Sequence, residues 1–174
     1  MPLATGIVIF LPPEAQAVAA PLERQYALES LIRVPPHISV LIPFVPYDQL
    51  DQALLTLQAI GAETEAFSIT LQGYDHFPGV IFMNPVNPDP IKGLFRKISA
   101  AFPTYLPYDG RHGNDLHPHV TVAEFEDDDQ RQQTTLPEYA PITFRVERFH
   151  IVYGMHSDDE VLPWLTYAVV PLNG

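Results

Sequence analysis

Apolar and polar positions alternate over many short segments of the chain, as they do in half-buried β-strands. The clearest segment is 142–147, where Ile142, Phe144 and Val146 alternate with polar neighbours. The pattern predicts strands at residues 7–11, 36–42, 66–71, 80–83, 118–123, 142–147, 149–153 and 164–170. Helical segments separate several of these strands, so we expect an α+β fold.

Apolar residues at helical spacing predict three helices, and prolines and glycines suggest where they begin and end. Pro21 is expected to kink or restart the first helix. Gly61 is expected to end the second in the left-handed conformation. Asp89 is expected to cap the third, with Pro90 as its first residue. The helices are predicted at residues 14–28, 48–61 and 89–103.

Composition limits the class of protein and its partners. The 174 residues suffice for a single domain, residues 1–174, with its own core. Cysteine is absent, which excludes disulfides, thiolate metal sites and cysteine nucleophiles. The net charge of −12 does not suit a long nucleic acid, because such a partner requires a basic face. No apolar run approaches the roughly 20 residues of a membrane span, and we expect a cytoplasmic monomer.

Two matching tetrapeptides stand out in predicted strands: His37-Ile38-Ser39-Val40 and His119-Val120-Thr121-Val122. In a strand, alternate residues share a face, so each histidine and the hydroxyl residue two positions later point the same way. The apolar residues between them then point into the core. Similar segments follow each tetrapeptide, which indicates a weak internal repeat with equivalent histidines.

Paired histidines suit proton transfer at a phosphorus atom. Imidazole has an ordinary pKa near 6.5, so one ring can act as base while the other acts as acid. Two facing rings would repel when both are charged, which favours the singly protonated pair and a rate profile bracketing neutral pH. The hydroxyls of Ser39 and Thr121 could donate to the non-bridging oxygens of a phosphate. This chemistry requires no metal and no cofactor.

At these residues the sequence resembles the two-histidine (2H) phosphoesterase superfamily, which includes bacterial 2'-5' RNA ligases and cyclic nucleotide phosphodiesterases. Pro36 and Pro118 precede the two histidines, as in many members. The resemblance implies two antiparallel sheets related by a pseudo-twofold axis around a central cleft, with helices on the outer faces. It also implies that His119 activates water and His37 protonates the leaving oxygen.

One departure from the family narrows the expected substrate. Many bacterial members carry arginine shortly after the second motif, whereas this chain has Glu124 there. An acidic run, Glu126 to Asp129, follows, and we read it as a solvated loop or a helix start. Both features argue against a large RNA substrate and against ligase activity.

Other residues are weaker candidates for the site. Tyr74 and Phe77, expected in a turn beside His76, could stack on a base. Arg111 and His112, in a polar loop at 105–116, could contact phosphate or ribose. As a competing hypothesis, the His-x-His pair formed by His117 and His119, with His112 and Asp115, could bind a transition metal.

Together these features predict a metal-independent phosphodiesterase. Its substrate would be a small nucleotide or a short RNA end, carrying a 2',3'-cyclic phosphate or a 2'-5' linkage. The alternative is a non-catalytic module that binds nucleotides or RNA ends in the same cleft.

Overall fold

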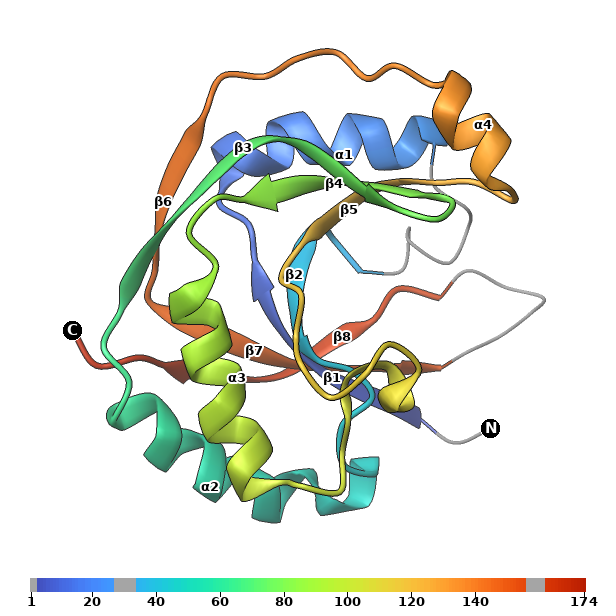
Figure 1. The fold of residues 1–174 in the computed structure, drawn as a ribbon. Helices are drawn as coiled ribbons and strands as arrows, with labels where there is room; N and C mark the ends of the chain where they lie inside the picture. The colour runs from blue at the N-terminus through green and yellow to red at the C-terminus, as the bar shows by residue number, and fades with distance from the viewer. Residues whose placement is uncertain (1–2, 27–33, 156–161) are drawn as a thin grey trace.

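Two antiparallel sheets of four strands each form the framework of the molecule (Figure 1). The computed structural model describes residues 3–26, 34–155 and 162–174. One sheet has the order β2-β1-β7-β8, with β1 at Leu3–Phe10, β2 at His37–Leu41, β7 at Arg148–Met155 and β8 at Leu165–Pro171. The other has the order β5-β4-β3-β6, with β3 at Phe67–Phe77, β4 at Val80–Pro85, β5 at Val120–Glu124 and β6 at Ile142–Val146.

The helices cover the outer sides of these sheets. Helix α2 (Leu50–Ala62) packs on β8, and α3 (Asp89–Ala101) packs on β2, so both cover the first sheet. Helix α1 (Pro13–Tyr26) packs against β5 of the second sheet. In Figure 1, α1 lies at the opposite end of the molecule from α2 and α3. The predicted α+β fold with outer helices is therefore confirmed.

The two motif strands occupy equivalent places, as the internal repeat predicts. Each is an edge strand of its own sheet, and each follows a strand and a helix, in the orders β1-α1-β2 and β4-α3-β5. Strands β2 and β5 contact each other across the space between the sheets. The topology thus places two chain segments far apart in sequence side by side.

Burial along the motif strands follows the period of two. Ile38, Val40, Val120 and Val122 are fully buried in the core. Each histidine and the hydroxyl residue two positions after it are partly exposed on the other face. Packing of the apolar residues therefore fixes which way the polar ones point.

The helix boundaries differ from the sequence predictions at three points. Helix α1 does not restart at Pro21, which lies inside it, and the predicted end at Leu28 lies outside the described residues. Asp89 is the first residue of α3 and Pro88 is its cap, and no side chain caps that end. Gly61 is helical and buried within α2 rather than left-handed at its end.

The strand predicted at 66–71 extends to Phe77, so Tyr74 and His76 belong to a strand and not to a turn. A bulge at Gly73, where φ is +68°, shifts the register and breaks the alternation that the sequence pattern relies on. The acidic run provides the start of a fourth helix, α4 (Asp128–Gln133). Over the described ranges, no helix has the length and apolar character needed to cross a membrane.

Gly61 is needed for close packing between α2 and β8. A Cβ atom on Gly61 would lie 2.5 Å from the carbonyl oxygen of Pro171 and 2.8 Å from Val170. We expect Gly61→Ala to lower the free energy of unfolding by about 1–3 kcal/mol, measured by chemical denaturation. Gly93→Ala is the matched control, because nothing lies within 4 Å of that position in α3. It should stabilise the protein by about 0.5–1 kcal/mol, and an equal loss in both variants would contradict the packing role.

Candidate active site

A cavity of about 740 Å³ lies between the two motif strands. All four motif side chains, those of His37, Ser39, His119 and Thr121, line it. The two tetrapeptides therefore share one cavity, as equivalent positions around a pseudo-twofold axis require. The other lining residues are Glu23, Phe77, Pro78, Val80, Pro107, Tyr108, His112, Gly113, Asp115, His117 and Glu124.

The two motif histidines are held in the same way. The Nδ1 atom of His37 lies 2.8 Å from the carbonyl oxygen of Pro35, and that of His119 lies 2.7 Å from the carbonyl oxygen of His117. A carbonyl oxygen only accepts, so each Nδ1 carries the proton and donates it. In the neutral rings Nε2 is consequently the free basic nitrogen, and the backbone sets this tautomer in both motifs.

Surrounding protein favours the neutral form of both rings. Burial lowers the pKa of His37, and the carbonyl of Pro35 offsets part of that shift. Burial is the main cause that lowers the pKa of His119 to about 4; the hydrogen bond to the His117 carbonyl offsets part of the shift, and the charges of His117 and His37 add to it. Without a ligand, both rings are neutral at pH 7.

The two hydroxyl residues differ in their surroundings. Ser39 shares a hydrogen bond with the phenol of Tyr108, which also lines the cavity. Burial raises the pKa of Tyr108, and the bond with Ser39 offsets part of the increase. Tyr108 has a φ of +52°, an unusual backbone conformation for a bulky residue, and its backbone N–H donates to the carbonyl of Ile42 at 2.7 Å. A strained loop therefore places this phenol against the first motif.

Aromatic rings hold the second motif in place. Phe77 meets the His119 ring edge-on, with ring centres 5.2 Å apart and planes at 90°. Phe82, which is 1% exposed, lies 5.2 Å from the same ring. The Tyr108 ring stacks at 6.4 Å. Three aromatic neighbours thus limit how far His119 can rotate.

The weaker sequence candidates divide into those at the cavity and those away from it. Phe77 and His112 line the cavity. Tyr74 does not; its hydroxyl donates to the carbonyl of Pro137 at 2.8 Å, and its ring packs against Tyr139. Arg111 is exposed and also lies outside the lining. Residues 74–77 pair with β4 in regular register, so Tyr74 and Phe77, three positions apart, point to opposite faces of the sheet.

The competing metal hypothesis gains no support from the geometry. In the described part of the chain, no three His, Asp or Glu side chains converge as a metal site would require. His117 packs its ring against Phe77 and Phe82, at centre distances of 5.2 and 5.6 Å. Its carbonyl oxygen accepts the hydrogen bond from Nδ1 of His119, so His117 helps to orient the second motif histidine.

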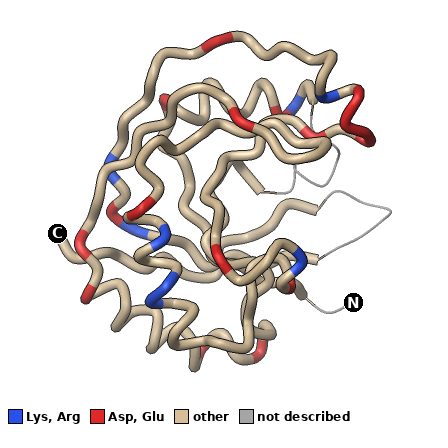
Figure 2. The backbone as a smooth tube through the Cα atoms, viewed as in Figure 1, with Lys and Arg blue, Asp and Glu red and all other residues tan. Residues whose placement is uncertain are grey.

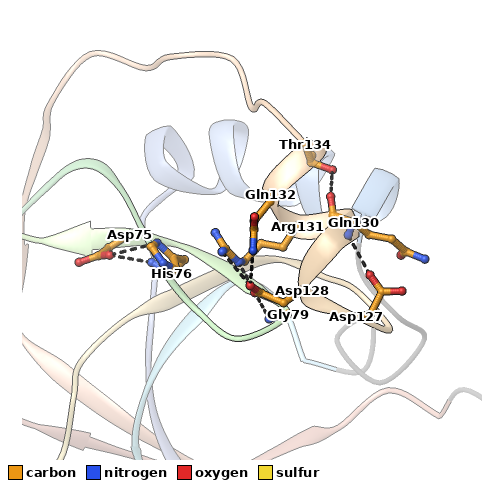
Figure 3. Close-up of polar contacts among 9 residues, drawn as sticks. All are labelled: Asp75, His76, Gly79, Asp127, Asp128, Gln130, Arg131, Gln132 and Thr134. Atoms are coloured by element: carbon orange, nitrogen blue, oxygen red, sulfur yellow. Dashed lines mark hydrogen bonds and ion pairs between the residues drawn. The ribbon is translucent and has the colours of Figure 1, made fainter.

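The acidic run after the second motif has mainly a structural role (Figure 3). Asp127 caps α4 by accepting from the backbone N–H of Gln130 at 2.8 Å. Asp128 accepts from Arg131, Gln132 and the backbone N–H of Gly79, which ties α4 to the β3–β4 turn. These donors hold the pKa of Asp128 well below its usual range. The reading as a helix start is confirmed.

Over residues 3–26, 34–155 and 162–174, the basic residues do not gather in one continuous stretch (Figure 2). Figure 2 shows the basic residues spread over several segments and a dense acidic stretch at α4. Among the described residues, the charged ones that line the cavity are Glu23, Asp115 and Glu124, and all of them are acidic. A long polyanion would find few partners around this cavity.

Two lining residues, Tyr108 and Glu23, are not among the candidates that the sequence patterns indicated. Tyr108 lies in an irregular turn, Pro107–Gly110, where period-two and helical patterns carry no information. Glu23 occupies a buried position on α1, next to Leu22. A charged residue among buried positions of a helix is a signal that could have identified it.

Comparisons with known proteins give a consistent result. Residues 11–157 match the sequence profile of the 2'-5' RNA ligase superfamily. Escherichia coli LigT complexed with NADP+ superposes with a TM-score of 0.72 at 15% identity, covering 99% of both chains. LigT complexed with 3'-AMP gives 0.72 at 14% identity over 100% of both chains. The protein TT0787 of Thermus thermophilus gives 0.62 at 18% identity over 98% of both. Curated protein sequences give no match.

Proposed function

Because the chain belongs to the 2'-5' RNA ligase superfamily of 2H phosphoesterases, we propose that it is a metal-independent phosphodiesterase acting on a small nucleotide. Its substrate is a 2',3'-cyclic phosphate or a short 2'-5' linkage. One observation carries the proposal: two His-x-Ser/Thr motifs, on edge strands of separate sheets, line a single cavity with their Nδ1 atoms bound to backbone carbonyls. That arrangement leaves two Nε2 atoms for proton transfer.

The reaction is a displacement at phosphorus. Neutral His119 takes a proton from water through Nε2, and the water oxygen forms a new bond to phosphorus. The bond between phosphorus and a ribose oxygen breaks, and protonated His37 gives its proton to that oxygen. Ser39 and Thr121 donate hydrogen bonds to the non-bridging oxygens, where negative charge builds up. One phosphomonoester and one ribose hydroxyl result.

The lowered pKa values supply the ionisation states in this scheme. A neutral His119 is ready to act as base. His37 needs a proton, and a bound phosphate anion favours the charged imidazole beside it. Binding of the substrate therefore completes the acid–base pair.

The size of the cavity and the ligands crystallised with LigT both support a small substrate. A volume of about 740 Å³ lies within the range of sites that bind compact ligands. LigT has been crystallised with NADP+, 3'-AMP and ATP. The acidic lining supports a nucleotide rather than a long RNA. We expect the protein to act as a cytoplasmic monomer.

Turnover in the presence of EDTA tests the proposal. The four 2',3'-cyclic nucleotides and 2'-5' and 3'-5' dinucleotides are incubated with the purified protein, and products are separated by chromatography. We expect hydrolysis of at least one small substrate to a single phosphomonoester. Nucleotide binding without hydrolysis would instead favour a binding module. Activity that EDTA abolishes would contradict the metal-independent mechanism.

The rate should depend on pH through the two imidazoles. In the free enzyme, kcat/KM requires one protonated ring, and burial lowers the pKa of both. We therefore expect kcat/KM to rise as the pH falls from 7 and to reach its maximum below about pH 6.5. The sequence alone placed this profile around neutrality.

The kcat profile provides the control for this reasoning. Bound phosphate raises the pKa of the nearby imidazole, so kcat should peak at a higher pH than kcat/KM. Both profiles come from initial rates between pH 4 and 9 in buffers of constant ionic strength. A flat kcat/KM from pH 5 to 9 would rule out histidine acid–base catalysis.

A further inference from the structure

Glu23 contributes a carboxyl group to the cavity, and no residue in the described ranges hydrogen-bonds to it. Its side chain comes from α1 and is 7% exposed, yet it lines the same cavity as His37 and His119. Within the described ranges the one charge that affects it is that of Arg24. The Glu23 oxygen atoms are not sealed from the cavity, so a ligand bound there can form hydrogen bonds with them.

The position of Glu23 separates it from the phosphate-binding motifs. Helix α1 packs against β5, the strand that begins beside His119 and ends at Glu124. Glu124 pairs with Val80 across the strands, and Val80 pairs with Phe77. All three of these residues line the cavity together with Glu23. The cavity therefore extends from the motifs toward α1, over a wall with apolar and aromatic surface.

The chemistry of this position favours a neutral carboxylic acid. Burial raises the pKa of Glu23 to about 8, and the Arg24 guanidinium offsets part of that increase. A second carboxyl group, that of Glu124, lines the same cavity. A protonated carboxyl group donates one hydrogen bond and accepts another, as an amide side chain does. Amide side chains pair in this way with the amino group and the adjacent ring nitrogen of adenine.

We infer that Glu23 is a specificity-determining residue whose carboxyl group hydrogen-bonds the Watson–Crick edge of a base with an amino group beside an unprotonated ring nitrogen, as in adenine. On that edge guanine has N1–H beside its amino group and offers no such acceptor. The phosphate then lies between the motifs while the base extends toward α1 over Phe77 and Val80. This inference rests on the proposed function for its catalytic readout, but base binding can be measured without turnover.

The test compares two substitutions of similar size. Glu23→Gln keeps one donor and one acceptor, whereas Glu23→Met keeps the volume and loses both. We expect Glu23→Met to lower kcat/KM for 2',3'-cyclic AMP by about 10- to 100-fold, mainly through KM, and for the guanine and uracil analogues by less than about 3-fold. Cytosine, with the same donor and acceptor pair, should follow adenine. Glu23→Gln should retain the preference for adenine. Glu14→Gln, on an exposed position of the same helix, should change nothing.

A binding measurement separates this inference from the catalytic proposal. Calorimetric titration with 3'-AMP and 3'-GMP is performed on the wild type and on both Glu23 variants. If no substrate is hydrolysed but Glu23→Met weakens binding of 3'-AMP selectively, the catalytic proposal fails and the role of Glu23 stands. If hydrolysis occurs and Glu23→Met affects all four bases equally, or affects none, the role of Glu23 is overturned.

Discussion

His37→Ala and His119→Ala should each lower kcat by about 10²- to 10⁴-fold, with little change in KM. Each substitution removes the Nε2 atom that takes or gives a proton, while Ser39 and Thr121 still hold the phosphate. The double variant should lose far less than the product of the two single losses, because the rings act as one unit. Single-turnover rates with 2',3'-cyclic nucleotides check this expectation.

The control for this prediction is another histidine. His76→Ala removes an exposed imidazole on β3 that pairs with Asp75 at 3.6 Å and does not line the cavity. It should leave kcat unchanged. Thermal unfolding of each variant shows whether the fold is retained. Independent, multiplicative losses at His37 and His119 would contradict a concerted displacement and would favour separate roles in binding.

The sequence was sufficient to predict the fold where burial alternates regularly. Val120 is fully buried between the partly exposed His119 and Thr121, so the period of two reads directly as a strand with one packed face. Prediction from the sequence failed where contacts between distant parts of the chain determine the role of a residue. Gly61 has the residue type of a helix end, but the close approach of Pro171, not a left-handed backbone, explains its small side chain. That contact joins residues far apart in sequence, so no local pattern could reveal it.

The same distinction applies to the cavity. His37 and His119 could be found because each carries its own repeated local pattern, and the repeat itself implied that they are equivalent. Tyr108 and Glu23 have no such pattern and reach the cavity through an irregular turn and a helix face. Their roles depend on hydrogen bonds and burial that only the three-dimensional arrangement supplies. Sequence therefore identified the two motifs better than the parts of the cavity that surround them.

Removing the hydroxyl of Thr121 should also lower activity strongly, though less than removing either motif histidine. Thr121→Val keeps the shape of the side chain and deletes one donor to the phosphate, whose hydrogen bonds gain strength as charge builds up in the transition state. A bond to a charged group contributes about 1.5–3 kcal/mol, so we expect kcat/KM to fall by about 10- to 150-fold. Thr121→Ser keeps the donor and should stay within about 3-fold of the wild type, because it loses only the methyl group that restricts the rotamer.

The same test at Ser39 also involves Tyr108, because the Ser39 hydroxyl forms a hydrogen bond with the Tyr108 phenol. Ser39→Ala removes a phosphate donor and also leaves the buried Tyr108 phenol without that partner, so its loss in kcat/KM should equal or exceed that of Thr121→Val. Tyr108→Phe removes only the bond that orients Ser39 and should lower kcat/KM less than either of these substitutions.

If Thr121→Val and Thr121→Ser lose activity equally, the methyl group rather than the hydroxyl matters at this position, and the prediction that Thr121 donates a hydrogen bond to the phosphate is wrong. If Tyr108→Phe costs more than Ser39→Ala, the phenol itself contacts the substrate.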